Sequence, residues 1–346
     1  MDRLTDISFL DGWIPVRFYW RDDQPMVDWC YLGPHRFQDP FFEQTVGQRI
    51  LEPFNLLFRH QTPMQLLGEL HEARPGIQPT GFIFHLSRSG STLVSQMLAA
   101  LAKNVVISEA RPIDSTLRSR FKDTTVTDEQ RSTWLRWMVS ALAQRRGDEE
   151  HFFIKFDAWN IFDVPLIRQA FPEVPWIFIY RDPVEVLVSQ MGHRGAHMVP
   201  GVINPLLFGM DVNAIMEMQP EVYCAKVLAA ICKAALQHRS DGGMLINYTQ
   251  LPDAFSTSIA GFFGVRWTDA EKQIMEAATK RHSKDPAAIF TGDSASKQNK
   301  AHEQLREAAT RWLDPIYEML EIARLEAEHV EAQRSERDIR RLRRLH

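Results

Sequence analysis

A short polar loop at residues 86–92 has the composition of an anion-binding turn. It reads LSRSGST and separates an apolar, β-favouring run at 81–86 from a run at 91–101 with apolar residues at helical spacing. Unpaired backbone N–H groups at a helix start, together with the helix dipole, attract phosphate or sulfate. Gly90 permits a close backbone approach, and Arg88 adds a fixed positive charge. We predict that these two residues bind an anion together with Ser89, Ser91 and Thr92.

This loop differs from the phosphate-binding loop of ordinary nucleoside triphosphatases. Their pattern is G-x-x-x-x-G-K-[ST], and the loop contains no Gly–Lys pair. The missing lysine would contact the β- and γ-phosphates. The sequence therefore disfavours a plain nucleoside triphosphatase.

A second candidate anion site follows the apolar run WIFIY at 176–180. Arg181, Asp182 and Pro183 come directly after it, and Ser189 lies eight residues beyond the arginine. We expect Arg181 at the carboxyl end of a strand, where α/β sheets bind their ligands. Ser189 then lies about two turns into the next helix, with Asp182 as its N-cap. The chain thus offers two anion sites in a fixed order.

These motifs resemble those of sulfotransferases over residues 81–317. HLSRSGSTLVSQML is similar to the loop that binds the 5′-phosphosulfate of the donor, with Ser87 where that family usually has proline. Arg181-Asp-Pro followed by Ser189 resembles the family's 3′-phosphate motif. The resemblance implies 3′-phosphoadenosine 5′-phosphosulfate as the sulfuryl donor, and it implies that no metal is needed.

Two further segments extend the resemblance. INYTQL at 246–251 is similar to a family segment through Tyr248, with Thr249 where a glutamate is usual. The polar stretch at 283–300 resembles a loop that folds over the nucleotide and returns a lysine to its phosphate. The resemblance therefore implies nucleotide-binding roles for Tyr248 and for Lys297, with Lys300 as the second choice.

The resemblance also implies a reacting centre. Lys155 and Arg88 stabilise charge on the donor, and Glu109 is the general base that takes the proton of a hydroxyl or amine acceptor. Burial would raise the pKa of Glu109 toward a useful range, whereas a neighbouring arginine would lower it. His85 is the competing base, although a histidine within an apolar strand is more often a packing residue.

Two other functions stay open. An ATP- and Mg²⁺-dependent phosphotransferase on the same fold would need an acidic metal ligand, for which Asp157 is the nearest candidate. The other is a non-catalytic nucleotide-binding module.

The elements that position these residues alternate between strand and helix. Apolar runs at 81–86, 105–108, 152–156, 176–180 and 244–248 are predicted strands. Helices are predicted at 91–101, 131–146, 164–170, 184–191 and 219–238. This alternation predicts an α/β fold with a doubly wound parallel sheet and flanking helices. We expect an accessory region at 1–78, with short strands and turns over 1–50 and a helical pattern over 51–70, a sulfotransferase-like domain at 79–317 and a charged helix at 318–346.

The composition limits the partners. A net charge of −4 gives no global basic field for nucleic acid, and no apolar run is long enough for a membrane span. Neither a signal peptide nor a cysteine pair with metal-ligand spacing is present, so we expect a cytoplasmic protein with buried free thiols. The expected partner is a small-molecule or peptide acceptor. Self-association through the charged terminal helix is a further possibility.

Overall fold

The computed structural model describes residues 7–279, 281–282, 285–289 and 294–342. They divide into two compact units. The first is formed within 1–85, 90–177 and 252–291, and the second within 86–89, 178–251 and 292–346. The predicted boundaries at residues 78 and 317 remain predictions.

The first unit begins with a β-hairpin. Strands β1 (Trp13–Arg21) and β2 (Gln24–Tyr31) pair antiparallel, and β3 (Gln61–Pro63) extends this small sheet. Asp22 and Asp23 form the hairpin turn, both with positive φ, as a two-residue turn of this kind requires. The expected short strands are confirmed. Helix α1 (Phe42–Arg49), however, lies where strands and turns were expected, whereas α2 (Pro53–Leu57) lies in the segment predicted to be helical.

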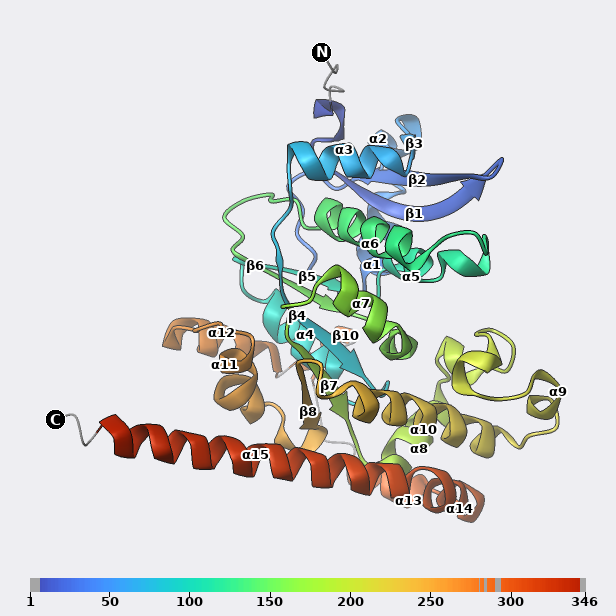
Figure 1. Cartoon of the computed structure of the whole chain (residues 1–346), viewed down its shortest axis with the longest axis vertical. Helices are drawn as coiled ribbons and strands as arrows, with labels where there is room; N and C mark the ends of the chain where they lie inside the picture. The colour runs from blue at the N-terminus through green and yellow to red at the C-terminus, as the bar shows by residue number, and fades with distance from the viewer. Residues whose placement is uncertain (1–6, 280, 283–284, 290–293, 343–346) are drawn as a thin grey trace. The chain divides into compact units, whose positions relative to one another are not determined.

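Helices cover this N-terminal sheet within the same unit. α6 (Asp128–Leu142) contacts both β1 and α3 (Gln65–Ala73), and α5 (Arg111–Leu117) also contacts β1 (Figure 1). A capping box starts α6, in which Thr127 and Gln130 each bind the other's backbone N–H. The N-terminal region therefore packs against α5 and α6, which belong to the predicted domain at 79–317.

The larger sheet has five strands in the order β5-β6-β4-β7-β8. β4 (Pro79–His85) and β5 (Asn104–Ser108) both pair parallel with β6 (His151–Lys155). α4 (Ser91–Ala99) connects β4 to β5, and α7 (Val164–Ala170) leads to β7 (Trp176–Tyr180). The predicted α/β fold with a parallel sheet is confirmed.

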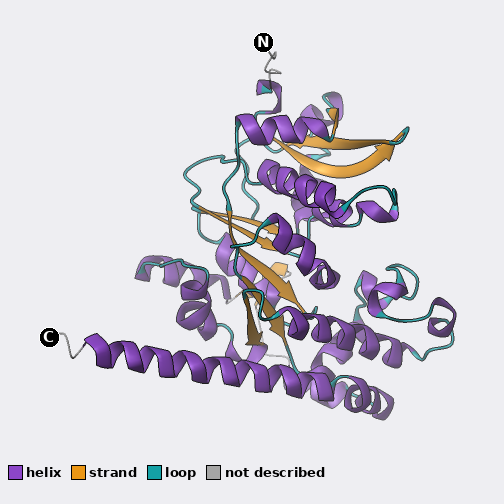
Figure 2. Ribbon diagram, in the orientation of Figure 1, coloured by secondary structure: helices purple, strands orange, loops and turns teal. Residues whose placement is uncertain are grey.

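The second unit is mainly helical (Figure 2). Its helices are α8 (Pro183–Gly192), α9 (Val212–Ile215), α10 (Pro220–His238), α13 (Ser294–Lys300), α14 (Glu303–Trp312) and α15 (Asp314–Leu342). α10 contacts α8, α14 and α15, and α15 also contacts β8 (Gly243–Asn247). The buried face of α10, which runs from Tyr223 to Ala235, supplies much of the core of this unit.

The region after Tyr248 contains helices and also strands, although the sequence predicts no strand there. α11 (Ala260–Phe262) and α12 (Asp269–Thr279) are helical, but β9 (Arg281–His282) and β10 (Asp285–Ile289) form an antiparallel pair. The predicted polar loop at 283–300 also contains α13. The strand pair and α13 were not predicted, because these short polar segments have no regular spacing of apolar residues.

The three cysteines are buried free thiols, as expected. Burial raises the pKa of Cys30 and of Cys224 to about 11, so both stay protonated at neutral pH. No helix in the described part of the chain combines the length and apolarity of a membrane span.

Candidate functional site

The predicted anion loop has a strained backbone. Ser87 and Arg88 have φ of 67° and 54°, and Gly90, the N-cap of α4, has φ of 93°. Positive φ is unfavourable for residues with a side chain, and such strain concentrates at ligand-binding turns. Because the cap is glycine, no side chain satisfies the first N–H groups of α4 from this position. These features fit the predicted role in binding an anion.

The first part of the loop is fixed by β7. The backbone N–H of Leu86 donates to the Ile179 carbonyl at 2.9 Å, and Ser89 Oγ donates to the same carbonyl at 2.8 Å. Ser89 is fully buried. Its hydroxyl hydrogen thus holds the loop, whereas the sequence predicts that this hydroxyl binds the anion. Ser91 and Thr92 are also buried, in the first turn of α4.

The loop is joined to the second motif within one unit. Arg88 Nε donates to Ser189 Oγ at 2.7 Å, and Gln190 Nε2 donates to Ser87 Oγ at 2.9 Å. Ser189 and Gln190 both lie in the second half of α8, and this position agrees with the one predicted for Ser189. Two motifs that are about a hundred residues apart in the chain therefore share a hydrogen-bonded site.

Arg181 is almost completely buried at the end of β7. Its guanidinium forms an ion pair with Glu185, donates to Ser294 Oγ at 3.2 Å, and lies 4.0 Å above the ring centre of Tyr248. Asp182 accepts from the N–H of Glu185 at 3.0 Å, which confirms its predicted role as the N-cap of α8. The structure brings Arg181 and Tyr248 together.

α13 contacts the same motif through polar side chains. Ser294 Oγ donates to Glu185 at 3.1 Å, and Gln298 Nε2 donates to Asp182 at 3.0 Å. Lys297 and Lys300 therefore lie on a helix, not on the predicted loop. Lys297 is half-buried and Lys300 is exposed.

The predicted reacting centre lies in the first unit. The ammonium of Lys155, which has no exposed surface, forms an ion pair with Glu109, and the ring centre of Phe41 lies 4.7 Å from the same nitrogen. His85 Nε2 lies 3.3 Å from Glu109 Oε1 and 3.1 Å from the Phe156 carbonyl. Glu109 itself follows β5 with a φ of 54°. The structure thus brings together the predicted base, its competitor and the predicted lysine.

The electrostatics of this cluster differ from the expectation. Burial raises the pKa of Glu109, but Lys155 and then His85 lower it further than burial raises it, so the pKa lies well below its usual value. Glu109 is ionised at neutral pH. In contrast, burial raises the pKa of Asp157 well above its usual range, and the neighbouring carboxylates of Glu109 and Asp114 add to this.

Sequence reasoning missed several residues of these clusters. Glu185 was readable in principle, because this carboxylate lies in the first turn of α8, four residues after Arg181. Phe41 gave no signal, because it lies in the N-terminal region, far in sequence from Lys155.

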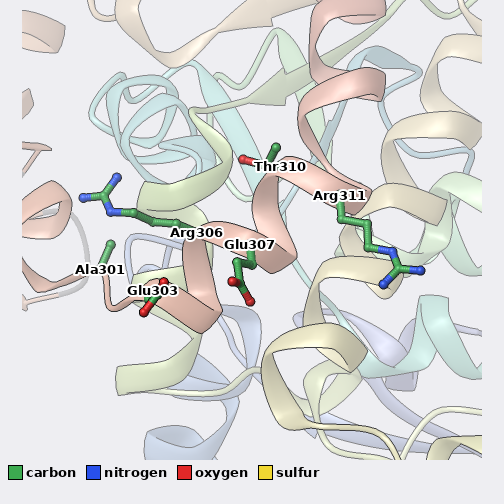
Figure 3. Close-up of a pocket in the computed structure, with 6 residues that line it drawn as sticks. All are labelled: Ala301, Glu303, Arg306, Glu307, Thr310 and Arg311. Atoms are coloured by element: carbon green, nitrogen blue, oxygen red, sulfur yellow. The ribbon is translucent and has the colours of Figure 1, made fainter.

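One open hollow in the second unit lies away from these residues. It runs along α14 and is lined by Ala301, Glu303, Arg306, Glu307, Thr310 and Arg311 (Figure 3). Arg306 and Arg311 extend in opposite directions, and none of the predicted site residues lines it. Among the described residues, no group of three or more His, Cys, Asp or Glu side chains is arranged to hold a metal ion.

Comparison with solved structures finds similar sulfotransferases. One from Alicyclobacillus acidocaldarius is 14% identical with a TM-score of 0.43, and the match covers 71% of this chain and 96% of that one. One from Mycobacterium avium is 11% identical with a TM-score of 0.42, covering 72% and 81%. Mouse sulfotransferase 7A1, complexed with PAP, is 13% identical with a TM-score of 0.41, covering 74% and 93%.

Comparison with sequences gives one family. No curated protein matches the chain. The sulfotransferase family model matches residues 79–200, which contain β4, the anion loop, Glu109, Lys155, Arg181 and Ser189. Over these residues, and through the motifs that they contain, the chain is similar to the sulfotransferase family.

Proposed function

We propose that this protein transfers a sulfuryl group from 3′-phosphoadenosine 5′-phosphosulfate to a hydroxyl or amine of a small-molecule or peptide acceptor. The observation that carries the proposal is the hydrogen bond from Arg88 to Ser189, because it links the loop to the helix of the Arg-Asp-Pro motif. A donor with two separated anionic groups needs both motifs.

Each motif has its own anion to bind. Arg181 and Ser189 bind the 3′-phosphate, with the ring of Tyr248 supporting the Arg181 guanidinium. We assign Arg88 to the same phosphate because it donates to Ser189, in place of the role at the reacting end of the donor that the resemblance implies. The first turn of α4, with Gly90, Ser91 and Thr92, binds the 5′-phosphosulfate through N–H groups and hydroxyls. Ser89 contributes by holding the loop, and Lys297 is the proposed additional cation.

The reacting centre then needs a base and a cation. The acceptor oxygen or nitrogen forms a bond to sulfur as the bond from sulfur to the bridging phosphate oxygen breaks, and Glu109 takes the acceptor proton. Lys155 stabilises the charge that collects on the bridging oxygen, and the products are the sulfated acceptor and adenosine 3′,5′-bisphosphate.

The ion pair between Glu109 and Lys155 supports a coupled role. While the ammonium of Lys155 pairs with it, the carboxylate is a weak base, because the positive charge stabilises its ionised form. Movement of that ammonium toward the donor oxygen raises the pKa of Glu109 and strengthens the base when the donor is bound.

Calorimetric titration of the full chain tests the donor. We expect micromolar binding of adenosine 3′,5′-bisphosphate and none of ATP with Mg²⁺. The opposite result would support the phosphotransferase alternative with Asp157 as the metal ligand. Binding of the bisphosphate without sulfuryl transfer to any of a panel of phenols, alcohols and amines would favour a non-catalytic module.

A further inference from the structure

Glu321 of α15 connects the two strands that lead into Arg181 and Tyr248. It accepts hydrogen bonds from the hydroxyl of Tyr180 at the end of β7 and from Asn247 Nδ2 at the end of β8, the latter at 2.9 Å. Both donors are buried and lie in the same unit as Glu321. One carboxylate therefore fixes the ends of two strands.

The residue after each donor belongs to the proposed 3′-phosphate site. Tyr180 precedes Arg181, and Asn247 precedes Tyr248. The guanidinium and the ring of these two following residues lie in contact at 4.0 Å. Consecutive residues are joined by a rigid, planar peptide bond. Hydrogen bonds that hold Tyr180 and Asn247 in place therefore also restrict the positions of the residues that follow them.

Asn247 connects this carboxylate to the backbone of Tyr248 itself. Its Nδ2 donates to Glu321, and its Oδ1 accepts from the N–H of Thr249 at 3.0 Å, which caps the turn Tyr248–Gln250. The Asn247 backbone N–H in turn donates to Gln250 Oε1 at 2.9 Å. Displacement of Asn247 would therefore move the turn that carries the Tyr248 ring.

The carboxylate is held in a charged, fixed state. Arg324 donates to both of its oxygens, at 3.3 and 2.8 Å. Burial raises the pKa of Glu321, but the bonds from Arg324, Asn247 and Tyr180 lower it below the ordinary value. Hydrogen bonds to an ionised acceptor are stronger than neutral ones, so this carboxylate is well suited to a positioning role.

We propose that Glu321 is a positioning residue for 3′-phosphate recognition: through Tyr180 and Asn247 it keeps Arg181 and Tyr248 in their stacked arrangement. This inference rests on the proposed function, since it assigns a role at the same nucleotide site. It extends that site to the C-terminal helix, outside the residues that the family model matches.

The test compares two ligands that differ only in the 3′-phosphate. Calorimetry on the full chain measures the binding of adenosine 3′,5′-bisphosphate and of AMP to the wild type, Glu321→Ala and Glu321→Gln. Glu326→Ala is the matched control, because it removes an exposed carboxylate from the same helix. We expect about tenfold weaker bisphosphate binding in Glu321→Ala with AMP binding unchanged.

The other variants sharpen the interpretation. Glu321→Gln recovers part of the loss, because an amide oxygen still accepts from Tyr180 and Asn247, and Glu326→Ala matches the wild type. If Glu321→Ala does not fold, Tyr180→Phe removes one of the hydrogen bonds and should lower the same affinity ratio by a smaller factor.

Equal weakening of both ligands, or no change for either, would overturn the positioning role. A wild-type protein that shows no preference for the bisphosphate would instead overturn the proposed function, and the inference with it.

Discussion

Arg88 Nε donates to the hydroxyl of Ser189 at 2.7 Å, across 101 residues of sequence. The bond joins the strained anion loop to the helix that follows Arg181, within one compact unit. Arg88 has further guanidinium nitrogens, and Ser189 Oγ has a hydrogen to donate, so the pair can contact a phosphate together. The two residues should therefore act jointly in nucleotide binding.

Ser189→Ala should weaken the binding of adenosine 3′,5′-bisphosphate by about tenfold, because it removes one donor to the phosphate and the partner of Arg88. AMP binding should change by less than about twofold. Calorimetry measures both, with Ser240→Ala as the control, since Ser240 is an exposed serine of the same unit. A parallel loss of both ligands would contradict the assignment of Ser189 to the 3′-phosphate.

Glu109→Gln should reduce kcat by about 10² to 10⁴, the usual contribution of a general base. The bisphosphate should still bind within about twofold, because the side chain is assigned to the acceptor proton. Steady-state rates and calorimetry measure these quantities. Glu129→Gln, a change at an exposed glutamate of α6, is the control. Retention of wild-type kcat would exclude Glu109 as the base and direct attention to His85.

The acidic limb of the pH profile should depend on Lys155. Glu109 acts in its ionised form, and its pKa in the free enzyme lies well below the usual value for a glutamate. Protonation of Glu109 should therefore lower kcat/KM only when the pH approaches this lowered pKa. Lys155→Met removes the main lowering charge and leaves burial to raise the pKa. The residual activity of this variant should therefore lose its acidic side at a higher pH than the wild type. An unshifted limb would show that another group controls it.

Gly90→Ala should destabilise the fold by about 1–3 kcal/mol, because alanine must adopt a φ of 93° at the start of α4. Urea unfolding measures the change in the free energy of unfolding. Gly192→Ala is the matched control, because a Cβ there meets nothing within 4 Å and needs no positive φ. If both variants unfold at the same urea concentration as the wild type, the strain assigned to the turn is absent.

Much of the fold was predictable because its central elements are short apolar runs between clear turn signals. β7 was predicted with the bounds that the structure has, and Asp182 was predicted as the cap of α8 because an aspartate before proline is a strong helix start. Polar elements gave no comparable signal. α13, with the sequence SASKQNK, contains no apolar stripe, so Lys297 was placed on a loop.

The candidate site was predictable in its residue types but not in its electrostatics. The position of Glu109 directly after β5, and that of Lys155 at the end of the neighbouring β6, were readable from the motifs. The direction of the Glu109 pKa shift was not, because it depends on whether the Lys155 ammonium lies against the carboxylate or is turned from it. From the sequence, Arg88 was the residue expected to lower the pKa of Glu109. In the structure Lys155 and His85 lower it.

The contact between Phe41 and the Lys155 ammonium limits how this enzyme can be trimmed. The family match begins at residue 79, so a shortened fragment starting there would look like a natural minimal domain. Such a fragment would lose the aromatic ring that shields a fully buried cation, and water would enter beside the proposed base. We therefore expect a fragment that starts at residue 79 to catalyse the proposed transfer more slowly than the full chain, because the N-terminal region supplies the ring beside Lys155.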